Sequence, residues 1–207
     1  MTRFLLVRHG ETTWNLDGRI QGQGDSPLSP AGVAQADALA RRLAGENADL
    51  LVSSDLGRTM QTAEPLARMS GLPLRAMAEF RERSFGIFEG LTLPEIAARY
   101  PDEHERWRSR DPAYAMPGGE SLGRLRERVE SALIDIARGG ARRVIVVTHG
   151  GVLDMIYRFV RGVSLEARRD WELLNASINT VSRSGEAWAL EHWGDVAHLE
   201  IARDDTD

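Results

Sequence analysis

The chain is predicted to fold as a three-layer α/β/α sandwich around a mostly parallel central sheet. Short runs of β-branched and aliphatic residues alternate with longer segments of helical periodicity, which is typical of a parallel sheet covered by helices on both faces. Two predicted strands, Leu5–Val7 and Val144–Val147, are each followed within two residues by the sequence His-Gly. Because the carboxyl ends of parallel strands meet at one edge of a sheet, we expect both histidines at that edge.

The other elements follow from capping residues and periodicity. Ser29 and Pro30 form a helix start, and the apolar residues that follow share one face until Gly45 ends the helix. Ser121 is expected to cap a long helix that ends at Gly139. Further along the chain the pattern predicts a strand at 49–53, helices at 56–69, 122–136 and 150–160, and a strand pair at 177–182 and 187–191.

Residues 83–119 break this alternation, with short helices, prolines and several aromatic residues. We interpret them as a cap-like insertion over the sheet edge, within a single domain of residues 1–207 rather than as a second domain. The apolar side chains in this segment could line a substrate cleft, although ordinary packing is expected for any one of them. They are Phe85, Trp107, Tyr114 and Met116.

The composition excludes several classes of protein. A hydrophobic content of 42% and a charged content of 28% are ordinary for a globular protein. A net charge of -5 without any basic run argues against a nucleic-acid binder. The absence of cysteine excludes disulfides, thiolate metal sites and a cysteine nucleophile. No apolar run is long enough for a membrane span, and the N-terminus lacks the apolar region of a signal peptide, so a cytoplasmic enzyme is expected.

His9 is the first candidate catalytic residue, as a nucleophile. An imidazole with an ordinary pKa of about 6.5 is largely neutral near neutral pH and can then attack an electrophile. Its other ring nitrogen must be held, typically by donating to a backbone carbonyl, and the tight loop at Gly10 could supply that carbonyl. The alternative is a structural histidine at a strand end, but the features described next favour a nucleophile.

Arg8 and Arg58 are candidate phosphate clamps. Arg58 follows a predicted strand at the start of a helix, where a guanidinium and backbone N–H groups can both face an anion. A cation in the first helical turn opposes the helix dipole, a small cost that is understandable if the arginine meets an anion. The alternative is a solvated surface arginine. The chain contains no lysine, and the planar forks of arginine suit phosphate and carboxylate groups.

Glu82 and His149 supply groups that can transfer or share protons. Glu82 lies between two arginines and could protonate a leaving oxygen and later accept a proton from water. An exposed, salt-bridging glutamate is an equally good reading of that local sequence. His149 would place a second imidazole beside the anion, where in its protonated form it could donate a hydrogen bond and neutralise charge.

The loop around Gln21 offers additional donors. Asn15 and the sequence Gln21-Gly22-Gln23 could contact further oxygens of an anion, although the turn cluster at 24–27 leaves a plain connecting loop as the alternative. Two histidines and a glutamate could also bind a metal ion. We expect none, because no His-x-His or His-Glu-x-x-His spacing is present and the arginines would repel a cation.

These residues lie in motifs that resemble the histidine phosphatase superfamily, which includes cofactor-dependent phosphoglycerate mutase. The motifs occur in the family's order from the N-terminus to about residue 155. They are LVRHGETTWN at 6–15, SSDLGRT at 53–59, RERSFG at 81–86, GGES at 118–121 and VTHGG at 147–151.

The resemblance implies a phosphoglycerate mutase-like fold and a phosphohistidine mechanism. His9 would be the nucleophile and Glu82 the general acid and base, with Arg8, Arg58 and His149 around the phosphate. It also implies a small-molecule phosphomonoester as partner, neither nucleic acid nor membrane, and a homodimer in line with the small members that often pair. The substrate- and phosphate-binding residues would be Asn15, Gln21, Gly22, Arg83 and Gly150.

Within this family the sequence favours a phosphatase without a cofactor over a mutase. Residues 19–29 resemble the phosphatase form of their loop, whereas mutases usually carry a Phe-x-Gly-Trp type sequence there. Residues 175–179 and 194–198 resemble the C-terminal portion of small bacterial phosphatases, and the chain ends in the acidic run 203–207. The alternatives are a phosphoglycerate mutase, which would need 2,3-bisphosphoglycerate, and a weakly active phospho-ligand binding protein. Sugar phosphates, phosphoglycerate derivatives and α-ribazole phosphate all remain open as substrates.

Overall fold

The computed structural model describes residues 1–199, and over these the predicted α/β fold is confirmed. The acidic run at 203–207 lies outside the described residues. The elements in chain order are β1 (Thr2–Arg8), α1 (Thr13–Leu16), α2 (Pro30–Leu43), β2 (Leu50–Ser53), α3 (Gly57–Ser70), β3 (Leu74–Ala76), α4 (Leu93–Arg99), α5 (Pro101–Arg108), α6 (Leu122–Arg138), β4 (Arg143–Thr148), α7 (Gly150–Arg161), β5 (Ile178–Ser184) and β6 (Ala187–Asp195), with short 3-10 turns at Ala78–Phe80 and Gly86–Phe88.

The six strands form one sheet in the order β3-β2-β4-β1-β5-β6. The first four are parallel, and β5 and β6 form an antiparallel hairpin at one edge. At the centre, β1 pairs with β4 so that Arg8 lies opposite Thr148. A histidine directly follows each of these two residues in the chain, so the register places His9 beside His149.

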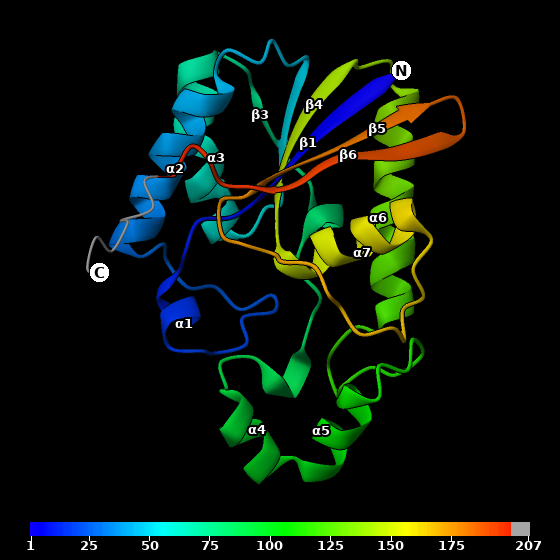
Figure 1. Ribbon diagram of the computed structural model, residues 1–207. Coiled ribbons are helices and arrows are strands. Elements are labelled where there is room, and N and C mark those ends of the chain that lie inside the picture. The colour runs from blue at the N-terminus through cyan, green and yellow to red at the C-terminus, as the bar shows by residue number, and fades with distance from the viewer. Residues whose placement is uncertain (200–207) are drawn as a thin grey trace, which may run out of the picture.

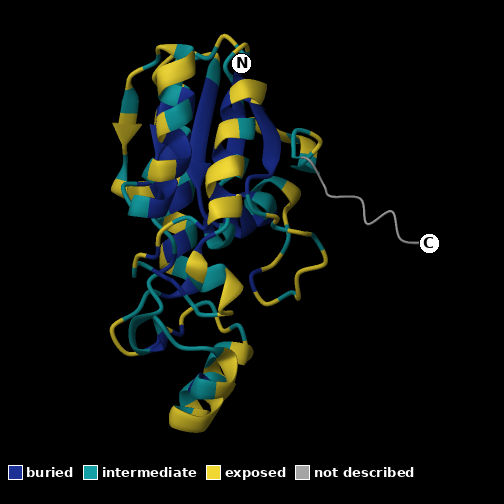
Figure 2. Cartoon of the chain, turned by 90° about the vertical axis from the view of Figure 1, so that its left-hand side faces the viewer, coloured by how far each residue is buried: buried dark blue, intermediate teal, exposed yellow. Residues whose placement is uncertain are grey.

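Helices cover both faces of this sheet and give the predicted three layers (Figure 1). Strand residues of one parity, such as Leu5 and Ile145, pack with α2 and α3, while the other parity, such as Leu6 and Val146, packs with α6 and α7. Because both faces are covered, the central strands are continuous apolar runs rather than alternating ones. Figure 2 shows the buried sheet enclosed by helices whose outward sides are exposed.

Helix starts follow the predicted caps. The Ser29 side chain accepts a hydrogen bond from the backbone N–H of Gly32 at the start of α2, and Ser121 does the same for Arg124 at the start of α6. The strand β3 was not predicted, because its three residues are one partly buried leucine and two exposed residues at the sheet edge. Over residues 1–199, no helix has both the length and the apolar character needed to cross a membrane.

Residues 83–119 lie beyond the carboxyl ends of the parallel strands, where α4 and α5 occupy the bottom of Figure 1. They have a small apolar cluster of their own, formed around the buried residues Phe88, Ile96, Tyr114 and Met116. All four apolar residues singled out from the sequence take part in this packing, with Tyr114 and Met116 buried in the cluster and Phe85 and Trp107 packed, partly buried, against it. That this segment is a cap-like insertion in a single domain remains our proposal.

Candidate active site

The imidazole of His9 is buried immediately after β1 and is held at one nitrogen. Its Nδ1 lies 2.8 Å from the carbonyl oxygen of Gly10, the contact expected from the sequence. Since a carbonyl only accepts, Nδ1 carries the proton and Nε2 keeps a free lone pair. The turn is fixed by Thr62 of α3, whose hydroxyl accepts from the Gly10 N–H at 3.0 Å. A side chain at position 10 would meet the carbonyl oxygen of Gly32 at 2.6 Å, so this turn needs glycine.

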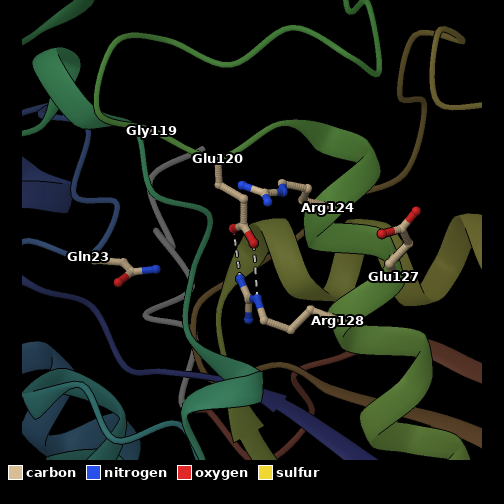
Figure 3. Close-up of a pocket in the computed structure, with 6 residues that line it drawn as sticks. All are labelled: Gln23, Gly119, Glu120, Arg124, Glu127 and Arg128. Carbon is tan, nitrogen blue, oxygen red and sulfur yellow. Dashed lines mark hydrogen bonds and ion pairs between the residues drawn. The ribbon is translucent and has the colours of Figure 1, made fainter.

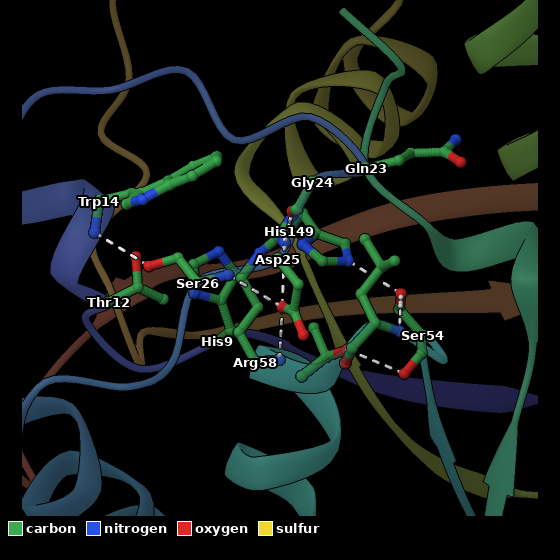
Figure 4. A network of polar contacts seen from close by, with 12 residues as sticks. His9, Thr12, Trp14, Gln23, Gly24, Asp25, Ser26, Ser54, Arg58 and His149 are labelled. Atoms are coloured by element: carbon green, nitrogen blue, oxygen red, sulfur yellow. Dashed lines mark hydrogen bonds and ion pairs between the residues drawn. The ribbon is translucent and has the colours of Figure 1, made fainter. Parts of the chain in front are cut away.

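His149 lies next to His9, with 5.3 Å between the ring centroids. Its Nε2 is 2.9 Å from the Ser54 hydroxyl, and its Nδ1 is buried without a hydrogen-bond partner among the described residues (Figure 4). The Ser54 hydroxyl accepts from the Leu56 N–H at 3.4 Å and has no acceptor other than Nε2 within hydrogen-bond distance among the described residues, so we assign its proton to the contact with Nε2. The proton of the His149 imidazole then sits on Nδ1, the unpaired nitrogen.

Both imidazoles are held in the neutral state. Burial lowers the pKa of His9 well below its ordinary value, and the charges of Arg8 and Arg58 add to this effect. Burial, followed by Arg58, His9 and Arg8, likewise lowers the pKa of His149. The lowered pKa leaves His9 Nε2 unprotonated, as a nucleophile requires. It also favours a neutral His149, and the protonated donor considered from the sequence stays a prediction, since a bound anion would raise that pKa.

Arg8 and Arg58 flank this pair of histidines. Arg8 is the last residue of β1, and its Nη1 donates to the carbonyl of Leu173. Arg58, fully buried in the first turn of α3, donates to the carbonyls of Gly22 and Gly24 at 2.7 and 2.8 Å. The Nε of each arginine is buried and has no partner within residues 1–199. Burial lowers the pKa of Arg8 to about 10, so the side chain stays charged near neutral pH.

Glu89 fixes the loop that holds Arg58. Its carboxylate accepts the backbone N–H groups of Gln23 and Gly24 at 3.0 and 3.1 Å, and that of Phe85 at 2.9 Å. Gly22 has φ +54°, and a Cβ there would meet the Glu89 carboxylate at 2.2 Å. Gly22 thus allows the close approach that positions Arg58, and its own contribution is made through its carbonyl oxygen.

Glu82 faces the helix that carries the second histidine. Its two carboxylate oxygens accept the N–H of Arg83 at 2.8 Å and that of Gly151, in the first turn of α7, at 2.9 Å. A Cβ at position 151 would meet Glu82 at 2.2 Å. The carboxylate is therefore held against the N-terminal end of α7, one residue past Gly150.

The backbone before Glu82 is anchored by two bidentate ion pairs. Arg81 binds Asp55 through two contacts of 2.6 Å. Arg128 of α6 binds Glu120 at 3.1 and 2.8 Å (Figure 3). It also donates to the carbonyl of Arg81 at 3.0 Å. A cavity of about 450 Å³ beside the Glu120–Arg128 ion pair is lined by neither His9 nor His149.

The other residues predicted from the sequence occupy different positions around the pocket. Asn15, the third residue of α1, completes a capping box with the N-cap Thr12, its side-chain oxygen accepting the Thr12 backbone N–H at 3.0 Å. Gln21 is buried with its Oε1 unpaired among the described residues. The Arg83 guanidinium donates hydrogen bonds to the carbonyls of Glu120 and Tyr114, at 2.7 and 3.3 Å.

A cavity of about 400 Å³ adjoins the site, large enough for a small metabolite. The candidate residues Arg8, Glu82, Arg83 and Gly150 line it. Its remaining walls are Phe85, Trp107, Arg110, Leu122, Leu125, Gly151, Asp154, Met155, Arg169 and Leu173. Over the described residues there is no group of three or more histidine, aspartate or glutamate side chains that could hold a metal ion.

Sequence reasoning did not identify three residues that position the site. Ser54 lies inside the SSDLGRT motif, but the sequence did not assign it a role. The residues around Glu89 in the sequence form no pattern that points to its function. Asn175 was quoted only as part of a C-terminal resemblance, yet its side chain donates to the His9 carbonyl at 3.0 Å. The contacts of all three join segments far apart in the sequence, so local pattern does not reveal them.

Comparison with known proteins identifies the family. The sequence model of the histidine phosphatase superfamily, branch 1, matches residues 4–196. The chain belongs to this superfamily. The resemblance stated from the sequence is thereby confirmed, as is the prediction of a histidine phosphatase-type phosphomonoesterase.

Individual relatives include phosphatases and a mutase-named protein. The chain is 41% identical to a metal-independent phosphoserine phosphatase of Arabidopsis thaliana, covering 96% of this chain and 84% of that protein. It is 34% identical to a probable phosphoglycerate mutase of Yersinia pestis, covering 97% and 96%. A solved mycobacterial glucosyl-3-phosphoglycerate phosphatase, in complex with VO3, has a TM-score of 0.83 and 32% identity, covering 94% and 99%.

The ionisation of the two buried histidines gives a first prediction. A histidine with a pKa of about 6.5 is roughly three-quarters protonated at pH 6, but a lowered pKa keeps His9 and His149 neutral there. We expect ¹⁵N–¹H spectra of the free protein at pH 6 to show both rings neutral, with the proton on Nδ1. The protein unfolded in urea is the control, because there both rings should titrate normally. An imidazolium signal from His9 at pH 6 would contradict this assignment.

Proposed function

We propose that this phosphatase hydrolyses phosphomonoesters in two steps, with His9 as the covalent carrier of the phosphoryl group. The observation that carries the proposal is the set of buried donors next to the free Nε2 of His9. The Nε groups of Arg8 and Arg58 and the Nδ1 of His149 lack partners among residues 1–199. Buried donors are almost always paired, so a cluster of unpaired ones suits an anion that brings its own acceptors.

In the first step, the lone pair on His9 Nε2 attacks phosphorus in line with the leaving oxygen. The N–P bond forms as the P–O bond to the leaving group breaks. Glu82, in its protonated form, gives its proton to that oxygen, so an alcohol departs. The hydrogen bond from Nδ1 to Gly10 keeps the ring aimed at phosphorus and stabilises the positive charge that the imidazole acquires.

In the second step, water attacks the phosphohistidine. Glu82, now a carboxylate, accepts a proton from the water while the P–N bond breaks and its electron pair returns to Nε2. Inorganic phosphate leaves and Glu82 is again protonated. One arginine-rich pocket serves both steps, because the charge on the three equatorial oxygens is similar in each transition state.

The substrate class follows from the cavity and the relatives together. A cavity of about 400 Å³ suits a small phosphorylated metabolite, and the relatives named above act on phosphoserine or on a phosphoglycerate derivative. We propose such a metabolite as substrate, hydrolysed without a metal ion or organic cofactor, since two guanidinium groups already supply the positive charge. A cytoplasmic location and a homodimer remain our expectations.

The covalent carrier is directly testable. Rapid quenching with ³²P-labelled substrate should trap an acid-labile, base-stable phosphoenzyme, because phosphohistidine has that stability. His9→Gln should form none and lose turnover, whereas the control His192→Gln, on exposed strand β6, should behave as wild type. Exhaustive EDTA treatment should leave the rate unchanged. A phosphoenzyme in His9→Gln, or one stable to acid, would assign the carrier to another residue.

Glu82 should matter most when the leaving group is poor. An alkoxide needs a proton to depart, whereas p-nitrophenolate does not, and general-acid help is worth about 10²–10⁴-fold. In single-turnover phosphorylation, Glu82→Gln should lose far more rate on an alkyl phosphate than on p-nitrophenyl phosphate. Glu79→Gln, the same change three residues earlier, is the control. Equal losses on both substrates would make Glu82 a positioning residue.

Phosphoglycerate mutase activity is the second candidate function, favoured by the relative named as a probable mutase. A mutase must protect its phosphohistidine from water and hold a bisphosphate, whose second phosphate brings up to two further negative charges. In a reaction primed with 2,3-bisphosphoglycerate, we expect phosphate release from 3-phosphoglycerate to exceed formation of 2-phosphoglycerate. Fast isomerisation with negligible free phosphate would make the protein a mutase, and no turnover of any ester would leave a phospho-ligand binding protein.

A further inference from the structure

The cavity of about 400 Å³ contains more positive charge than one phosphate requires. Its charged lining consists of Arg8, Arg83, Arg110 and Arg169 against two carboxylates, Glu82 and Asp154. With Arg8 assigned to the phosphate, three guanidinium groups face two carboxylates, one of which, Glu82, carries a proton in the proposed first step, so the surplus is at least one positive charge. A neutral or sugar-like remainder of the substrate would leave that charge unmatched.

Asp154 does not remove this surplus, because another arginine shares it. Asp154 lies about one helical turn beyond Gly151 on α7, and its carboxylate binds Arg158 of the same helix at 3.0 Å. Arg158 is fully buried and does not line the cavity. Arg110 approaches the same Asp154 oxygen only to 3.6 Å, so the carboxylate is divided between two cations.

Arg110 itself is built into the cavity wall. It follows α5 with φ +58°, a left-handed conformation that residues other than glycine rarely adopt. Its Nε donates to the carbonyl of Leu165 at 2.9 Å, while its Nη2, the atom 3.6 Å from Asp154, is buried and has no acceptor within hydrogen-bond distance among the described residues. A buried guanidinium nitrogen without an acceptor is costly unless a ligand supplies one.

Arg169 completes the cationic wall from the segment between α7 and β5. It lines the same cavity as Arg8 and Arg110, and its charge adds to the lowering of the pKa of both that burial causes. Arg169 has no carboxylate within ion-pair distance in the described part of the chain, and its side chain is exposed enough to reorient. Arg110 and Arg169 therefore offer free donors on the same cavity as the phosphate pocket.

We propose that Arg110 and Arg169 bind a carboxylate of the substrate, so that the preferred substrate is the phosphomonoester of a small hydroxy acid or hydroxy amino acid. The proposal rests on the proposed function, because the cavity is the one that Arg8 and Glu82 line. A carboxylate brings one negative charge to this surplus and matches the bidentate donor geometry of a guanidinium. A second phosphate would bring up to two negative charges to Arg169 and to an Arg110 whose charge Asp154 already shares.

Paired substrates test the carboxylate directly. We expect kcat/KM for O-phosphoserine to exceed that for O-phosphoethanolamine, which differs only in lacking the carboxylate, by roughly 10–100-fold, as for charge-assisted hydrogen bonds. The pair 3-phosphoglycerate and glycerol 3-phosphate should show the same preference. Propane-1,3-diol bisphosphate, with a second phosphate and no carboxylate, should be a poorer substrate than 3-phosphoglycerate. A ratio near one in both pairs, or a preference for the bisphosphate, would overturn the proposal.

Variants locate the effect. Arg110→Met and Arg169→Met should each reduce the ratio of kcat/KM between the paired substrates. The reduction should come mainly from a higher KM for the substrate that carries the carboxylate. Arg124→Met makes the same change at an exposed position on α6, and should keep the full ratio. Arg169 is exposed, so its variant keeps the test valid if Arg110→Met unfolds. An unchanged ratio in Arg169→Met and in any folded Arg110→Met would overturn the assignment.

Binding separates this proposal from the proposed function. In His9→Gln, which cannot form the phosphoenzyme, calorimetry should still show tighter binding of O-phosphoserine than of O-phosphoethanolamine, and Arg169→Met should reduce that difference. If the wild-type protein hydrolyses no ester yet keeps this difference in binding, the proposed function fails and the carboxylate site stands. If it hydrolyses both esters equally and binds them equally, the carboxylate site fails and the phosphatase stands.

Discussion

The parallel pairing of β1 with β4 is the constraint on which the rest of the site depends. One register, with Arg8 opposite Thr148, makes the two following histidines neighbours at the edge of the sheet. A slip by one residue would exchange the side chains that β1 presents to the two helical layers, so the core that α2, α3, α6 and α7 build with the sheet also fixes the spacing of the two imidazoles. Core packing and catalytic geometry are therefore one requirement.

Around that pair, loops are held by charge rather than by apolar packing. Glu89 holds the loop at 22–24, which in turn holds Arg58, and the ion pairs of Arg81 and Arg128 anchor the segment that leads into Glu82. Each of these links pairs a carboxylate or carbonyl with a donor that would otherwise be unmatched. The few buried donors that remain unpaired are available to a ligand. Paired polar groups therefore mark the scaffold, and unpaired ones mark the binding pocket.

The sequence predicted a residue's role where its contacts are made by residues close to it in the chain. His9 and His149 were found because each follows a strand of the predicted parallel sheet, and the N–H contact of His9 to Gly10 follows from the next residue in the chain. Glu82 needed the family resemblance, since its local sequence was equally consistent with a surface ion pair. The positioning contacts of Glu89 and Asn175 join segments tens to more than a hundred residues apart, and the short edge strand β3 has too few buried residues to produce a pattern.

The exclusive use of arginine has a consequence for how this site responds to alkaline conditions. Burial brings the pKa of Arg8 and of Arg83 down from 12.5 to about 10, and both still carry their charge at physiological pH. A lysine ammonium starts from a pKa of about 10.4, so the same burial would bring its titration close to neutrality. A pocket built from lysines at these depths would begin to lose its positive charge just above neutral pH. Guanidinium groups let this protein bury its cations deeply and keep them charged at that pH.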